Sequence, residues 1–441
     1  MGNFLKNSAI TFFTDISSLV LSFIAMIILT RVLGPGGKGI YSLILLIPGM
    51  MMTFGSFGLE SANAYFIASK KYKVQEVFSN SLILVFLLGL ILILVFFGIF
   101  QMSFFQNFIN EKQIPAPYLW IVIALIPVSF LLVFFRGIIY GKEQIINYNK
   151  TKILENIFYL TGIIVFLLIL KQGIFGAVSS YVISIIGATF LSLIFIKRIT
   201  KFYFSFSKKL LKESAVYGGK VYLANIFSLL NYRLDMLLIA IFLAPTAVGF
   251  YSIAVGISER LFMIPGALST VLFPKICSAE KSAADELTSR IIRHIFFIMI
   301  MISLVLAFVS VPLIRILFGS VFLPSVAPLI ILLPGTVAFC IGGVIAADLS
   351  GRGKPQFAIY SSFACLIVNV ALNIILIPKW GISGAAWASS VAYSIDTLVI
   401  LIAFLIISKK SLSEVLLIKK RDFKDYLIVF SGFKNLIKNN L

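Results

Sequence analysis

The chain has 441 residues, of which 60% are hydrophobic and only 12% are charged, and its mean hydropathy is +1.07. Soluble proteins carry about 25% charged residues, so this composition excludes a water-soluble enzyme. The 37 lysines and arginines outnumber the 17 aspartates and glutamates, which gives a net charge of +20. In a membrane protein such a surplus indicates orientation rather than nucleic-acid binding, because short cytoplasmic loops collect Lys and Arg.

Twelve apolar stretches are long enough to cross a bilayer, since one helical crossing needs about 20 residues. An all-α integral membrane protein is expected, because backbone polar groups in lipid must be satisfied within each helix and the alternation typical of barrel strands is missing. In chain order the stretches are residues 9–30, 39–68, 79–101, 117–140, 152–170, 176–196, 214–242, 246–272, 290–314, 325–350, 355–376 and 380–408.

The basic residues predict which side of the membrane each loop faces. With the N-terminus inside, the cytoplasmic segments and adjoining helix turns hold 27 of the 37 Lys and Arg, and the outside loops hold six. Both termini are therefore predicted to be cytoplasmic, in a multi-pass membrane protein. We expect an N-lobe over 1–205, a C-lobe over 206–410 and a basic tail over 411–441, which is either an interfacial helix or disordered.

Motifs for catalysis and metal binding are missing from the sequence. It contains no GxxxxGK[ST], HExxH or GxSxG pattern, and no outside loop is longer than about 15 residues. The lone His294 and the scattered Cys277, Cys340 and Cys365 provide neither a metal site nor a disulfide framework. We expect no catalytic residues, no cofactor and no nucleic-acid partner.

The two halves of the chain match one another. Residues 33–43 (LGPGGKGIYSL) and 243–253 (LAPTAVGFYSI) share five of eleven positions at an offset of 210, and 171–177 matches 379–385 at an offset of 208. Because each half has six spans, both halves enter the membrane in the same direction. The sequence therefore predicts two parallel six-helix repeats around a central cavity.

Two short patterns are similar to those of a known family. They are Thr30-Arg31-Val32-Leu33-Gly34-Pro35 followed by Gly39-Ile40-Tyr41, and Val248-Gly249-Phe250-Tyr251 ahead of Glu259-Arg260 and Ile264-Pro265. The chain resembles, over nearly its whole length, the polysaccharide-flippase family of the multidrug and oligosaccharidyl-lipid exporter superfamily. The resemblance implies two rocking lobes that carry an undecaprenyl-diphosphate-linked oligosaccharide to the outer leaflet, and the twelve spans favour the O-antigen or capsule type.

Ionisable residues inside the predicted spans are costly, at about 2.5–3.5 kcal/mol each near a span centre. Four of them lie near cytoplasmic span ends, where snorkelling lowers the cost: Arg136, Glu155, Lys220 and Asp348. The deeper carboxylates belong to polar stripes at helical spacing, which indicate either a water-filled cavity or interhelical hydrogen bonds. The stripes are Thr11, Asp15, Ser18 and Ser22; Thr53, Ser56, Glu60 and Asn63; Asn225, Ser228, Tyr232 and Asp235; and Ser389, Tyr393 and Asp396.

These residues provide the candidate sites. A lipid diphosphate would be bound by arginine forks and polar groups, for which the candidates are Arg233, Arg260, Lys220, Arg31, Asn225 and Tyr232. Coupling to H⁺ or Na⁺ would use a deep carboxylate, for which the candidates are Asp15, Glu60, Asp235, Glu259 and Asp396.

The expected partners are the lipid-linked oligosaccharide, membrane lipids and other polysaccharide-assembly proteins. Two alternatives stay open, namely a cation-coupled multidrug antiporter of the same fold and a membrane-embedded glycosyl- or acyltransferase.

Overall fold

The protein is an all-α integral membrane protein. Its computed structural model describes all residues except 1, 57, 201–204, 279, 420–421 and 423–441, and for 2–9, 220–225, 228–229, 270–271, 273–274 and 278 it describes the backbone only. Nine helices within this described part are long and apolar enough to cross a membrane. No β-strand occurs among the same residues.

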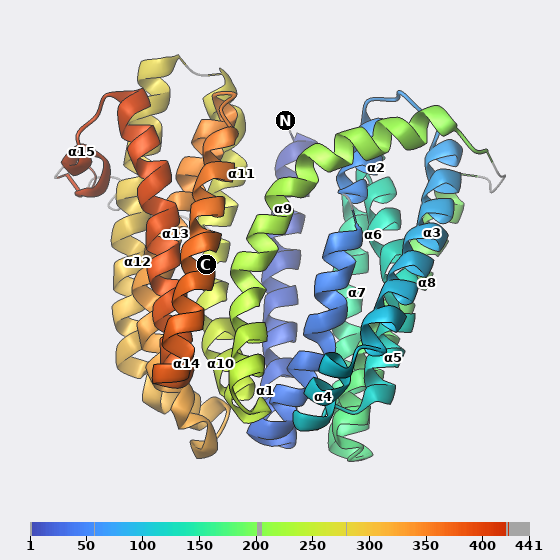
Figure 1. Ribbon diagram of the computed structural model, residues 1–441. Helices are drawn as coiled ribbons and strands as arrows, with labels where there is room; N and C mark the ends of the chain where they lie inside the picture. The colour runs from blue at the N-terminus through green and yellow to red at the C-terminus, as the bar shows by residue number, and fades with distance from the viewer. Residues whose placement is uncertain (1, 57, 201–204, 279, 420–421, 423–441) are drawn as a thin grey trace, which may run out of the picture. The chain divides into compact units, whose positions relative to one another are not determined.

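Eleven of the twelve predicted spans overlap these nine helices. Two of the nine are each broken by a glycine with non-helical backbone angles, Gly34 at φ 64° and Gly381 at φ 58°, so each contains two spans. Figure 1 shows both helices reversing direction along their length. The seventh predicted span lies on the further helix α9, Lys208–Phe242. The nine helices thus account for eleven predicted spans, and α9 accounts for the twelfth.

By their internal contacts the residues form two compact units. Unit 1 comprises Met1–Ser252 with Ile314–Leu323, and unit 2 comprises Ile253–Leu313 with Pro324–Leu441. The predicted lobe boundary at 205/206 concerns the repeat and remains a prediction. The tail over 411–441 is described only at its start, where α15 forms, and the proposed interfacial helix lies outside the described residues.

Unit 1 contains the helices from α1 to α9, together with the first part of α10 and the end of α12. The first part of α9 runs across the ends of α2 and α3, and its second part runs beside α1 (Figure 1). Aromatic and aliphatic side chains of α2, α3, α6 and α8 form a buried core at the same end of the unit. The bounds are α1 Gly2–Gly55, α2 Leu59–Ala68, α3 Val74–Phe100, α4 Ser103–Glu111, α5 Ala116–Ala124, α6 Ile126–Gly141, α7 Ile145–Gly162, the π-helix η1 Ile163–Ile169 and α8 Gly173–Ile199.

Unit 2 is built around α13 and α14. The two arms of α14 lie before and after the kink at Gly381, and α13 and α14 pack against α11 and α12. The eighth predicted span, 246–272, is not one regular helix. A 3₁₀ segment, η2 (Glu259–Phe262), interrupts it between α10 and α11. The bounds are α10 Pro245–Ser258, α11 Met263–Ser278, α12 Lys281–Leu317, the 3₁₀ helix η3 Ser320–Ser325, α13 Val326–Gly351, α14 Gln356–Ser408 and α15 Leu412–Leu416.

The predicted repeat has a structural counterpart at equivalent glycines. Gly173 and Gly381, which are 208 residues apart, both have a left-handed backbone, at φ 56° and 58°. Left-handed angles cost little only for glycine, so the same turn chemistry recurs at the same place in each half. Gly39 and Gly249, 210 residues apart, also occupy matching environments, each against the backbone of the partner repeat's proline.

Candidate functional site

A charged cluster lies in unit 1 where α1, α2, α6 and α7 meet. Close helix approach creates it, because Gly137 and Gly141 of α6 lie against the backbone of α2. A Cβ at these glycines would lie 2.7 Å from the carbonyl oxygens of Glu60 and Ala64. Small residues spaced by four allow this packing between membrane helices, and the packing places the neighbouring Arg136 close to Glu60.

Two ion pairs join the helices of the charged cluster. Arg136 donates to the Glu155 carboxylate at 2.6 Å and also to the side chain and backbone oxygens of Thr151. Lys152 donates to the Asp15 carboxylate at 2.6 Å. All four charged side chains are partly buried, so the pairs are structural ties as well as polar groups within the membrane.

Glu60 is the third carboxylate of the charged cluster. It is partly buried and is attracted electrostatically by Arg136 and Lys152. Among the described residues it has neither a hydrogen bond nor an ion pair of its own. The cluster therefore carries three carboxylates against two cations, and Glu60 is the one that has no bonded cation. A carboxylate in this state can exchange a proton or a metal cation without breaking a helix-to-helix contact.

Other members of the predicted stripes make interhelical hydrogen bonds. Asn149 donates to Thr11 at 2.9 Å, and Asn63 donates to the buried Ser81 at 2.9 Å. Asp235 is only 1% exposed and accepts hydrogen bonds from the Tyr251 hydroxyl and the Met236 backbone, both at 2.6 Å. For these residues the contacts agree with the second interpretation of the polar stripes, which is hydrogen bonding between helices, rather than with a water-filled cavity.

Unit 2 contains a separate buried carboxylate, Asp396 of α14. It is 6% exposed and lies against Ser361, Thr397 and the backbone at Gly342, while its Oδ1 has no hydrogen-bond partner in the described part of the chain. The stripe neighbours Ser389 and Tyr393 pack inside the unit, the first accepting a long hydrogen bond from Asn369.

The predicted phosphate-binding arginines have different surroundings. Arg31 is exposed and donates to the backbone oxygens of Leu317, at 2.7 Å, and Ile316. These are terminal carbonyls of α12, so Arg31 caps that helix favourably with respect to its dipole. Arg233 contacts the Tyr232 carbonyl, and Arg260 donates to the carbonyl of Gly256 beside the 3₁₀ break.

The remaining candidates are only partly described. Glu259 and Tyr232 are half-buried, in η2 and α9 respectively. The side chains of Lys220 and Asn225 lie outside the described set. The roles of all the predicted site residues stay predictions.

Sequence reasoning missed Lys152, which begins the fifth predicted span and pairs with Asp15. The signal was available, because a cation at a span end must find a counter-charge or water. It also assigned Asp348 to snorkelling, whereas this residue is fully buried and bonded to Arg352 and Thr288. Arg136 and Glu155, assigned in the same way, pair with each other.

An apolar pocket of about 450 Å³ also lies in unit 1. Its walls are formed by side chains of α3, α4, α9 and the second arm of α1, which is the part of that helix after the kink at Gly34. Its volume is in the range of small-molecule and lipid-chain sites. The lining residues are Ile47, Met50, Met51, Phe54, Leu92, Val95, Phe96, Ile99, Phe104, Phe105, Phe108, Leu237 and Ile241.

Two relatives match most of the chain. An uncharacterized membrane protein of Methanocaldococcus jannaschii is 26% identical over 408 residues, covering 87% of this chain and 94% of its own. A putative O-antigen transporter of Shigella flexneri is 23% identical over 407 residues, covering 90% and 96%. A place in a bacterial inner membrane fits the Shigella flexneri match.

Two solved structures share the fold. A lipid II flippase in an inward closed conformation superposes with a TM-score of 0.68 at 19% identity, covering 92% of this chain and 90% of that one. An inward-facing multidrug resistance MATE family transporter of the MOP superfamily superposes with a TM-score of 0.73 at 15% identity, covering 90% and 96%. At these identities the likeness concerns the fold, which is that of transporters.

The family described as polysaccharide biosynthesis protein matches residues 4–280, which is more than half of the chain. The Shigella flexneri relative and the two structural neighbours are named as transporters or flippases, not as enzymes. The chain is accordingly a multi-pass membrane protein, and it belongs to the polysaccharide biosynthesis protein family.

Proposed function

We propose that this protein is a flippase that moves an undecaprenyl-diphosphate-linked oligosaccharide across the bacterial inner membrane by alternating access, driven by H⁺ or Na⁺. Family membership and the O-antigen transporter relative support a saccharide-carrying lipid as the substrate. An unaided sugar head would lose several hydrogen bonds to water in the hydrocarbon, each costing a few kcal/mol. A protein path with polar groups lowers that barrier.

The observation that carries the proposal is the presence of the charged cluster and the apolar pocket in one unit. An amphiphile needs polar groups for its head and an apolar surface for its chain, and unit 1 provides both. A path for a compact hydrophilic solute would not need a 450 Å³ pocket lined by aliphatic and aromatic side chains. The pocket is proposed to receive part of the prenyl chain.

Two neighbouring residues of α3 test this use of the pocket. Both side chains are exposed, at 48% for Val95 and 58% for Leu94, but only Val95 lines the pocket. Val95→Trp would fill the pocket and Leu94→Trp would not, although both add the same group at the same depth. In cells that lack their own flippase, we expect Val95→Trp to reduce surface-polysaccharide assembly several-fold at normal abundance and Leu94→Trp to leave it unchanged.

The same assay distinguishes the antiporter alternative. Wild-type protein that restores resistance to lipophilic cations but never restores polysaccharide assembly would refute the flippase proposal. Equal loss with both tryptophan variants would refute the role of the pocket alone.

Coupling is proposed to use Glu60, with Asp396 as a second candidate in unit 2. Glu60→Gln removes the charge without removing an ion pair, so we expect normal abundance and transport that no longer follows the proton or sodium gradient. Glu155→Gln is the matched control, because it breaks the bond to Arg136 and should lower abundance instead. Unchanged gradient dependence in both Glu60→Gln and Asp396→Asn would reject these carboxylates.

Diphosphate binding is proposed for Arg233 and Arg260. A lysine keeps the charge but loses the bidentate fork. Arg→Lys should therefore impair flipping in part and Arg→Ala should impair it severely, at normal abundance. Full activity of the Arg233→Ala, Arg260→Ala double variant would remove both residues from the substrate site.

A further inference from the structure

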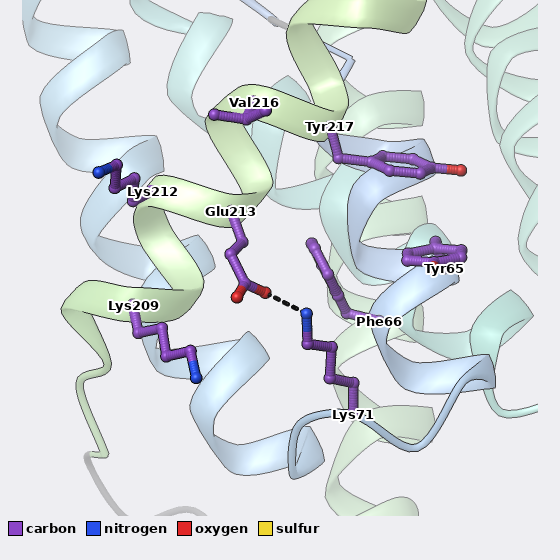
Figure 2. Close-up of a pocket in the computed structure, with 8 residues that line it drawn as sticks. All are labelled: Tyr65, Phe66, Lys71, Lys209, Lys212, Glu213, Val216 and Tyr217. Atoms are coloured by element: carbon purple, nitrogen blue, oxygen red, sulfur yellow. Dashed lines mark ion pairs between the residues drawn. The ribbon is translucent and has the colours of Figure 1, made fainter.

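A second pocket, of about 490 Å³, lies at one end of unit 1, where the loop after α2 meets the first turns of α9 (Figure 2). None of its residues belongs to the charged cluster or to the apolar pocket. Its lining consists of Tyr65, Phe66, Lys71, Lys209, Lys212, Glu213, Val216 and Tyr217.

The pocket has an excess of positive charge. Lys71 pairs with Glu213 at 2.8 Å, and its amino group is half-exposed beside the Phe66 ring. Lys209 attracts the same carboxylate, but neither Lys209 nor Lys212 has an ion pair within the described part of the chain. Three lysines therefore face one glutamate.

These lysines occupy an unfavourable place for stability alone. Lys209 and Lys212 follow the N-cap Ser207 of α9, whose first turn contains no acidic residue. The N-terminus of a helix carries partial positive charge and favours anions, so cations there reduce helix stability. A bound anion would remove this conflict, since it would interact with both the lysines and the helix terminus.

The other wall of the pocket is aromatic. The Tyr65 and Tyr217 rings stack at 4.5 Å between centroids, with 11° between their planes. Figure 2 shows the two rings on the side away from Lys209 and Lys212. A tyrosine pair offers a flat apolar face with hydroxyl tips, which suits the carbon skeleton and hydroxyls of a glycerol or sugar next to a charged group.

The chemistry of the two walls is that of a lipid headgroup. The pocket takes Lys71 from the loop after α2 and Lys209 and Lys212 from the start of α9, at the ends of predicted spans, where lipid phosphates are found. We propose that it binds the phosphate or diphosphate group of a membrane lipid, with Lys71, Lys209 and Lys212 as cationic ligands and the tyrosine pair against the adjoining glycerol or sugar. This site is additional to the transport path.

Full-length purified protein tests the proposal with three probes. They are phosphatidylglycerol and phosphatidylcholine, each in nanodiscs or followed by native mass spectrometry, and inorganic pyrophosphate in detergent. The double variant Lys71→Gln, Lys209→Gln should weaken phosphatidylglycerol binding about tenfold, as expected for lost charge-assisted hydrogen bonds. The matched control Lys73→Gln, Lys208→Gln changes equally many charges in the same segments but outside the pocket, and binding should persist.

The probes also identify the source of the phosphate. Saturable pyrophosphate binding that the pocket variant loses would show that the anion alone is sufficient, whereas loss confined to phosphatidylglycerol would show a requirement for the lipid. Equal weakening by both double variants, or binding of phosphatidylcholine as tight as that of phosphatidylglycerol, would overturn the proposal.

Glu213→Gln separates ligand binding from a structural role. It removes the carboxylate that competes for Lys71, so anion binding should tighten several-fold. If the ion pair only fastened α9 to the α2–α3 loop, the same variant would lower the unfolding temperature and leave binding unchanged, which would also contradict the proposal.

Discussion

Gly39 and Gly249 each pack against the backbone of the other repeat. We therefore expect a Gly→Ala substitution, which adds one methyl group, to lower the stability of the protein markedly. A Cβ on Gly39 would lie 1.8 Å from the Pro245 carbonyl oxygen, and a Cβ on Gly249 would lie 2.1 Å from that of Pro35. The two glycines and the two prolines are repeat equivalents at an offset of 210. Both obstructing atoms are backbone, so no side-chain rotation can relieve the clash.

The size of the effect follows from this geometry. Moving the new Cβ of Gly39→Ala from 1.8 Å to an ordinary contact of 3.4 Å requires a backbone shift of about 1.6 Å. Overpacking costs about 1–3 kcal/mol, and a contact between two backbones belongs at the upper end. Alanine gains about 1 kcal/mol over glycine in a helix. The net expectation is a loss of about 2 kcal/mol.

Gly49→Ala is the matched control, because it lies in the same arm of α1 and its Cβ would meet no atom within 4 Å. In detergent, Gly39→Ala and Gly249→Ala should each lower the apparent unfolding temperature by several degrees, and Gly49→Ala should hold or raise it. The double variant should lose less than the sum, since both changes separate the same pair of segments. Wild-type unfolding of Gly39→Ala would refute the contact.

The remaining predictions concern topology, burial and pH. Reporter fusions after Lys409 and within the 197–212 linker should both report cytoplasm, and a periplasmic signal from either would refute the assigned orientation. Arg293 and Asp422 are both 0% exposed and pair at 2.6 Å, whereas Glu286 lies 3.7 Å from Arg293. Asp422→Asn leaves the buried Arg293 with the longer ion pair, so it should cost about 3 kcal/mol in thermal unfolding, at the lower end for a broken buried pair, and a neutral result would reject that contact. The ion pair with Lys71 lowers the pKa of Glu213 below its usual 4.5. The stabilising effect of this pair should therefore be present above pH 4.5 and should disappear as the pH falls through the lowered pKa. The Glu213→Gln variant should lack this pH-dependent stabilisation at every pH.

The arrangement of spans could be predicted because it depends on short-range properties. Apolar length and loop charge indicated twelve crossings, and each of the twelve overlaps observed helices, although the second, 39–68, is divided between α1 and α2. The matched glycines of the repeat also proved informative, since Gly173 and Gly381 share a left-handed backbone for one physical reason. Interruptions inside spans escaped the prediction. The 3₁₀ segment at Glu259–Phe262 begins with two charged residues inside an apolar span, and hydropathy registers their charge but not the change of helix type.

The candidate site was predicted only in part, because helical spacing gives the face of a residue but not its partner. Asp15 and Glu60 were expected on polar faces, yet their different states depend on Lys152 and Arg136 from other helices. Arg31 was expected to contact substrate, and the observed contact is the end of α12, which is 285 residues away in sequence. Contacts at such separations depend on tertiary packing, which no local pattern contains.

The buried carboxylate Asp422 and the partly buried carboxylate Glu60 differ in their pairing with cations, and this difference predicts different roles. Asp422 shares both oxygens with Arg293, so losing its charge would break the contact between the start of the tail and α12. Glu60 is attracted electrostatically by Arg136 and Lys152 but forms an ion pair with neither. These two cations instead pair with Glu155 and Asp15. Only the second arrangement allows a charge to be neutralised and restored in each cycle while the helices stay packed. A coupling carboxylate in the charged cluster is therefore expected to be the one that no cation binds, which among the described residues of the cluster is Glu60.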